Sequence, residues 1–178
     1  MNKAMKKKSV KTGLPPGSLI HIGDKKNKDV HIRLFSYTED NFEEKLIEVN
    51  KLSQLLTLKS GVHWIAVEGI HDVNIIKELG DVFGLHPLVL EDILNTDHRP
   101  TIENYDKYIY IVAKLLLYDE KESEFSTEQE SFILGENYII SFSERKTGIY
   151  DKVQERIGRV LVIPEKWEQT IYFILYLM

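Results

Sequence analysis

The sequence predicts an α/β domain in which one mixed β-sheet has helices packed on its faces, an α/β/α sandwich. Two observations support this prediction. Strand and helix patterns alternate in the first half of the chain, whereas residues 105–142 contain consecutive strand patterns joined by short polar turns. Apolar residues make up 43% and charged residues 29% of the 178 residues, a composition typical of one folded domain with its own core.

The first half of the chain contains three strand patterns. Residues 30–37 alternate between apolar and polar side chains, as expected for a half-buried strand. Residues 62–68 are almost continuously apolar, as expected for a central strand that is covered on both faces. A weaker alternation at residues 18–22 predicts a short edge strand.

Helix signals lie between and after these strands. Thr38 is a candidate N-cap, Asp72 precedes apolar residues with a 3.6-residue period that ends at Gly84, and Pro87 suits a first helical turn. The predicted helices are one or two short helices in 39–58, then 72–84, 87–95 and 149–157.

The second half is predicted to be a meander of strands. Residues 105–117, 124–134 and 138–142 are rich in β-branched and aromatic residues. The polar residues at 119–122 and 135–137 predict the turns between them. In this prediction, consecutive hairpins in the second half follow the alternating strands and helices of the first half along the chain.

Charge and composition exclude several classes of function. The net charge is −5 although residues 1–12 carry five lysines and no acid, so the remaining chain is strongly acidic. We interpret 1–12 as a basic flexible tail; the acidic remainder argues against nucleic acid as a partner and is compatible with cations. The absence of cysteine excludes disulfides and thiolate metal sites. The sequence contains no phosphate-binding loop and no nucleophile elbow, and we predict no small organic substrate.

The predicted helix at 87–95 carries an unusual polar strip. At about 100° per residue, Glu91, Asp92 and Asn95 share one strip, and Leu88 lies within it. An apolar residue beside two acids and an amide is compatible with contact to another surface. The pattern by itself favours the simpler interpretation, a solvated acidic face with one stray leucine.

The same segment resembles a known family. Residues 86–95 (His-Pro-Leu-Val-Leu-Glu-Asp-Ile-Leu-Asn) followed by His98-Arg99-Pro100 resemble the central motif of the cytoplasmic domain of CorA-type magnesium transporters. Other stretches agree in order and spacing over residues 13–157: Gly13 to Gly17, Trp64-Ile65, Gly69 to His71, Glu128-Gln129, Ser131 to Leu134, and Tyr138 to Phe142.

The resemblance implies a function. Members of this family are homopentameric membrane channels for Mg²⁺, with Co²⁺ and Ni²⁺ as further ions, and each subunit has a cytoplasmic α/β/α domain, a stalk helix and two transmembrane helices. Regulatory Mg²⁺ between neighbouring cytoplasmic domains holds the pore closed. By this resemblance Asp92 is a metal ligand, Glu91 belongs to an adjacent second site, and Leu88 and Asn95 lie at a subunit interface. The sequence is then a cytoplasmic regulatory domain lacking the stalk and the membrane helices.

Two alternatives remain open. One is a zinc-handling member of the same family. The other, from a different class, is a soluble metal-dependent hydrolase that uses His71, His86 and Asp92. This enzyme is the weaker hypothesis because none of the six histidines is paired at the helical spacing of a zinc site, and the three residues would have to converge in one cleft.

The resemblance stops after residue 157. We therefore divide the chain into the tail 1–12, the regulatory domain 13–157 and a non-family tail 158–178. The last segment is interpreted as a frame-shifted start of the stalk helix or a remnant of cloning. Codons for Lys166–Tyr172 can encode the family-like Met-Gly-Ala-Asp-Tyr-Leu when read two bases later. Without stalk and membrane helices, this chain is not expected to form a robust pentamer.

Overall fold

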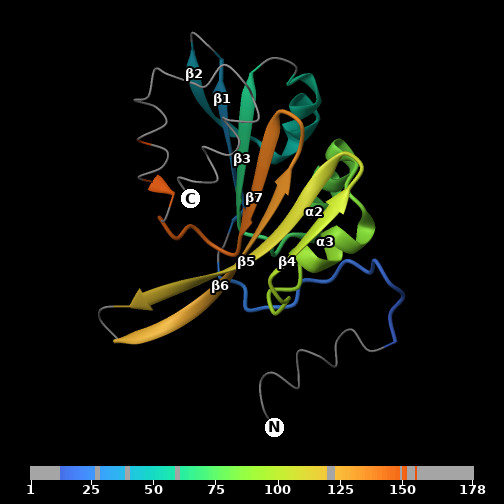
Figure 1. The fold of residues 1–178 in the computed structure, drawn as a ribbon, viewed down its shortest axis with the longest axis vertical. Helices are drawn as coiled ribbons and strands as arrows, with labels where there is room; N and C mark the ends of the chain where they lie inside the picture. The colour runs from blue at the N-terminus through green and yellow to red at the C-terminus, as the bar shows by residue number, and fades with distance from the viewer. Residues whose placement is uncertain are drawn as a thin grey trace.

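The computed structural model describes residues 13–26, 29–38, 41–58, 61–119, 123–148, 150–151 and 155. These residues form a seven-stranded sheet in the order β2-β1-β3-β7-β6-β5-β4 (Figure 1). The strands are β1 His31–Tyr37, β2 Phe42–Ile47, β3 Val62–Glu68, β4 Thr101–Tyr105, β5 Tyr108–Asp119, β6 Glu124–Leu134 and β7 Tyr138–Ser143. Only the β3–β7 pair is parallel, so the sheet is mixed and the predicted fold class is confirmed.

The described helices cover one face of this sheet (Figure 1). They are η1 Val49–Thr57, α2 Val73–Phe83 and α3 Pro87–Ile93. Ile65 and Val67 of β3 belong to the core cluster beneath these helices, whereas Trp64 belongs to a smaller cluster on the opposite face together with Tyr150. The predicted helix at 149–157 lies largely outside the described residues. No helix in the described ranges is long and apolar enough to cross a membrane.

Local signals set the ends of the two α-helices as predicted. The Asp72 carboxylate accepts a hydrogen bond from the Asn74 amide at 3.0 Å and caps α2, and Gly84 ends it at a φ of 63° that favours glycine. At α3, the His86 ring Nδ1 accepts from the Leu88 amide at 3.2 Å, and Pro87 occupies the first turn.

The prediction of helices throughout 39–58 was wrong for its first part. Residues 42–47 form the edge strand β2, which pairs with β1 so that Tyr37 lies opposite Phe42. Thr38, expected as a helix cap, instead closes the hairpin, since its amide donates to the Asn41 carbonyl at 2.9 Å. The side chains at 43–46 are exposed, which suits an edge strand, and their charges suggested a solvated helix.

Two strand predictions also need correction. The predicted strand 105–117 corresponds to β5, which begins at Tyr108, and the sequence analysis missed β4, which ends at Tyr105 and pairs with β5 across a turn at residues 106–107. This turn has no glycine, so the usual hairpin signal was missing. The predicted edge strand at 18–22 is only a single bridge from Ile22 to Asn95.

Candidate functional site

Helix α3 presents its polar strip beside a buried apolar side. Val89, Leu90 and Ile93 are buried, as the helical wheel predicted. Glu91, Asp92 and Asn95 are half-buried, and the side chain of Leu88 is 42% exposed. The strip therefore combines carboxylates with an exposed apolar side chain.

Asp92 is held in place through both its side chain and its backbone. Its carboxylate Oδ1 lies 3.3 Å from Nε2 of His98, and its side chain is 24% exposed. Its backbone carbonyl accepts a hydrogen bond from Nε2 of Gln129 at 3.1 Å. The carboxylate is accordingly fixed at a surface position that an ion from solvent can reach.

Glu91 lies where the amino-terminal segment crosses α3. The Gly17 amide donates to Glu91 Oε2 at 2.6 Å, a short hydrogen bond to a charged acceptor. Gly17 has a φ of +81°, and a Cβ there would lie 3.2 Å from Cβ of Pro87. The backbone conformation thus favours glycine at this crossing, and a larger residue would also require Pro87 to shift slightly. Glu91 anchors this segment with one of its oxygens.

The same segment continues along the end of α3. The Ile22 amide donates to the Leu94 carbonyl at 2.8 Å, and the Thr96 amide donates to the Ile22 carbonyl at 3.0 Å. The Thr96 hydroxyl donates to the same carbonyl at 3.0 Å. These bonds fix the backbone on both sides of Asn95.

Residues from β5 and β6 support the carboxyl end of the helix. Lys114 Nζ donates to the Thr96 carbonyl at 2.7 Å and to Gln129 Oε1 at 3.2 Å, and burial lowers the pKa of Lys114. The sequence analysis assigned no role to either side chain. Alternation along β6 could have indicated Gln129, because it places Gln129 on the same face as the buried Ile133.

Tyrosines from the β4–β5 hairpin support the other end of α3. The His86 amide donates to the Tyr108 hydroxyl oxygen at 2.9 Å, and the His86 ring lies 5.9 Å from that of Tyr105. Burial and the neighbouring Glu103 raise the pKa of Tyr105 to about 12, so its hydroxyl stays neutral. His86 is thereby engaged in capping and ring packing.

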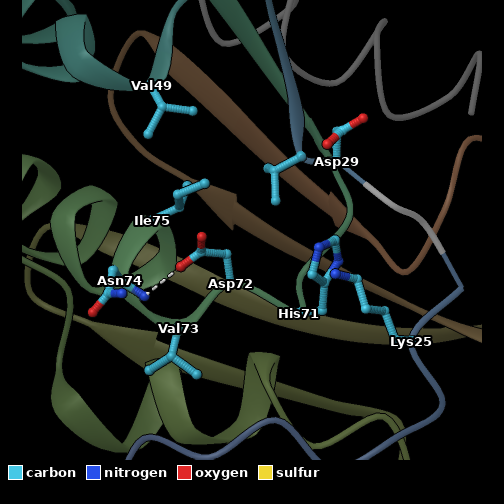
Figure 2. Close-up of a pocket in the computed structure, with 9 residues that line it drawn as sticks. Lys25, Asp29, Val49, His71, Asp72, Val73, Asn74 and Ile75 are labelled. Atoms are coloured by element: carbon cyan, nitrogen blue, oxygen red, sulfur yellow. Dashed lines mark hydrogen bonds between the residues drawn. The ribbon is translucent and has the colours of Figure 1, made fainter.

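The described pocket that contains His71 does not include the other two residues of the hydrolase hypothesis. A pocket of about 580 Å³ at the start of α2 contains His71 (Figure 2). It is lined by Lys25, Asp29, Val30, Val49, His71, Asp72, Val73, Asn74 and Ile75. His86 and Asp92 are not among these residues, and Asp72 is engaged with the Asn74 amide, as the dashed line shows. This pocket therefore does not bring the three residues together.

The polar strip fits Mg²⁺ only as part of a site. Within the described ranges, no group of three or more His, Cys, Asp or Glu side chains could hold a metal ion. Mg²⁺ binds oxygen, keeps several of its waters and often uses only one or two carboxylates. Asp92, with Glu91 beside it, supplies that number.

Comparisons with known proteins identify the family to which this chain belongs. Residues 59–178 match the family model described as CorA-like Mg²⁺ transporter protein. The chain is 36% identical over 171 residues to the cobalt/magnesium transport protein CorA of Thermotoga maritima, an alignment that covers 94% of this chain and 48% of that protein. The chain thus spans about half the length of this relative. The matched range includes residues 158–178, and the division at residue 157 stays a prediction.

Solved structures share the fold at low sequence identity. The soluble domain of CorA from Methanocaldococcus jannaschii has a TM-score of 0.57 at 16% identity, covering 82% of this chain and 53% of that chain. The ZntB cytoplasmic domain from Vibrio parahaemolyticus has a TM-score of 0.53 at 12% identity, covering 72% of this chain and 50% of that chain. Since the family model matches well over half of the residues, this chain belongs to the CorA-like Mg²⁺ transporter family.

Proposed function

We propose that this chain is the cytoplasmic cation-sensing domain of a CorA-type membrane channel for Mg²⁺, with Co²⁺ as a further ion. The whole protein is a homopentamer anchored by membrane helices outside this chain. Mg²⁺ bound between neighbouring copies favours the closed pore. Asp92 is a metal ligand and Glu91 lies at an adjacent second site, while Leu88 and Asn95 contact the neighbouring subunit.

The observation that carries this proposal is the position of Asp92. Its backbone carbonyl accepts from Gln129, its carboxylate lies partly exposed beside His98, and the apolar Leu88 of the same strip is 42% exposed. Burial of this leucine in a subunit interface would stabilise the contact. A carboxylate at the edge of that contact can share an ion with a carboxylate of the next subunit.

The chemistry of the strip suits a sensor. A site that completes its coordination from two subunits binds an ion weakly and fills only when the ion is abundant. Because the ion binds the conformation in which both carboxylates converge, it shifts the population toward that conformation. One or two carboxylates per subunit are enough for this role.

Protease protection of the full-length protein tests the proposal. Mg²⁺ should protect the wild-type protein, and Asp92→Ala should weaken that protection because it removes a shared carboxylate. Asp81→Ala is the matched control, since Asp81 is an exposed acid on α2, away from the strip. Wild-type protection by Mg²⁺ in Asp92→Ala would show that Asp92 has no sensing role.

A further inference from the structure

We propose that His98 is a second protein ligand of the cation site at Asp92, and that it makes this site prefer first-row transition cations such as Co²⁺ over Mg²⁺. The inference rests on the proposed function, because it takes Asp92 to be a cation ligand. It goes further in assigning a ligand role to His98 and a preference to the site.

The hydrogen bond of the ring determines which nitrogen faces Asp92 as an acceptor. Nδ1 of His98 lies 2.9 Å from the carbonyl oxygen of Arg99. A carbonyl oxygen can only accept, so Nδ1 carries the hydrogen of the neutral imidazole. Nε2 then holds a lone pair, and it lies 3.3 Å from Oδ1 of Asp92, which is also an acceptor. A metal ion placed between these two atoms would be bound by both of them.

This arrangement is the one that metal-binding histidines usually have. A ligating imidazole commonly donates its other N–H to a backbone carbonyl or a carboxylate, which fixes the tautomer and the ring orientation. The Arg99 carbonyl has that position here. Two ligands that each lie about 2.0–2.1 Å from a tetrahedral ion are separated by about 3.3 Å. The Nε2–Oδ1 distance of 3.3 Å agrees with this value.

The backbone between the two residues holds them at this distance. The Asn95 amide donates to the Asp92 carbonyl at 3.2 Å, and the His98 amide donates to the Asn95 carbonyl at 3.0 Å. The side chains of Asp92 and His98 remain 24% and 25% exposed. The pair is therefore ordered by a compact turn and still open to an ion from solvent.

The donor set determines the preferred class of ion. Mg²⁺ selects oxygen donors and retains its waters, whereas imidazole nitrogen suits Co²⁺, Ni²⁺ and Zn²⁺. A carboxylate with an adjacent imidazole thus favours the transition cations. His98→Gln replaces the nitrogen donor by an oxygen donor and should reverse the preference.

Two measurements on the 178-residue chain test this inference. Calorimetric titrations with Co²⁺ alone and with Mg²⁺ alone give the affinity for each ion, and X-ray absorption at the cobalt edge shows whether imidazole binds the bound Co²⁺. Wild type should bind Co²⁺ more tightly and show imidazole ligation. His98→Gln should weaken Co²⁺ binding about tenfold or more, change Mg²⁺ binding much less, and lose the imidazole signal. His31→Gln is the matched control, because His31 is exposed and lies at the start of β1.

The outcomes separate this inference from the proposed function. If Asp92→Asn weakens the binding of both ions while His98→Gln changes neither, only the His98 inference is wrong. If Asp92→Asn changes the binding of neither ion, the His98 inference is wrong, whereas the proposed function is decided by the protease protection of the full-length protein. Tighter binding of Mg²⁺ than of Co²⁺ by wild type, or an imidazole signal that survives in His98→Gln, would also overturn the inference.

Discussion

Two pairs of carboxylates occupy very different environments in this domain. Glu91 and Asp92 on α3 are half-buried, whereas Glu128 and Glu130 on β6 are 2% and 0% exposed. The sequence analysis assigned a metal role to the first pair and used Glu128 only as part of a motif. Carboxylates can therefore serve either a site for an external ion or an internal structural network. The degree to which the carboxylates are buried distinguishes the two.

The buried carboxylates of Glu128 and Glu130 have cationic and hydroxyl partners within the fold. Arg145 Nε lies 2.6 Å from Glu128 Oε1, and Lys26 Nζ lies 3.3 Å from the same oxygen. Lys26 also lies 2.9 Å from Glu144 Oε2. Glu130 accepts a hydrogen bond from the Ser143 hydroxyl at 3.0 Å. The cations and the hydroxyl compensate only in part for the loss of water around these acids, because Glu128 Oε2 and Glu130 Oε1 have no hydrogen-bond partner among the described residues.

The largest effect is expected from Glu128→Ala. Removing this buried carboxylate takes away the charged acceptor of the Arg145 hydrogen bond and one ion-pair partner of Lys26, which should lower the free energy of unfolding by about 3 kcal/mol. Urea unfolding followed by tryptophan fluorescence measures the change. Glu124→Ala, an exposed acid on the same strand, should change it by less than about 0.5 kcal/mol. Equal effects of the two variants would contradict the contrast between buried and exposed acids.

A somewhat smaller effect is expected from Glu130→Gln, and it should depend on pH. Burial, with Glu128 and Glu144 nearby, raises the pKa of Glu130 from 4.5 to about 8, although hydrogen bonds from Ser143 and Tyr150 oppose the rise. The folded protein therefore keeps a proton that the unfolded chain releases above about pH 4.5. The stability contributed by this proton is fully present below that pH and is lost as the pH rises through about 8.

Glutamine imitates the protonated acid at every pH. Glu130→Gln should therefore be more stable than wild type by on the order of 2 kcal/mol at pH 9, with the difference shrinking toward pH 5. Urea unfolding at several pH values measures both the difference and its slope. A constant difference across this range would mean that Glu130 does not change its protonation on folding.

The smallest effect on stability is expected at the half-buried pair on α3. Asp92→Asn keeps the backbone carbonyl that accepts from Gln129 and alters a partly exposed contact with His98. Its free energy of unfolding should change by less than about 0.5 kcal/mol. Thermal unfolding without added metal checks this value. A loss as large as that of Glu128→Ala would show that Asp92 belongs to the structural network instead.

The predictions from the sequence were correct where a local residue pattern is compatible with only one type of secondary structure. The continuous apolar run of β3, the cap at Asp72 and the proline at 87 each predicted an element that the structure contains. It failed at β2, where an edge strand and a solvated helix carry similar charged residues. Pairing with β1 decided that segment, and such pairing has no signal within the segment itself.

For the candidate site, too, some features follow from the local sequence and others only from the packing of distant segments. By itself, the sequence determined α3, its buried side and the adjacency of Glu91, Asp92 and the exposed Leu88, because helical periodicity is a local property. Only the tertiary structure placed the Gly17 amide on Glu91 and the Gln129 amide on the Asp92 carbonyl. These contacts join residues that are 74 and 37 positions apart, and such partners are set by how the sheet and the amino-terminal segment pack around the helix.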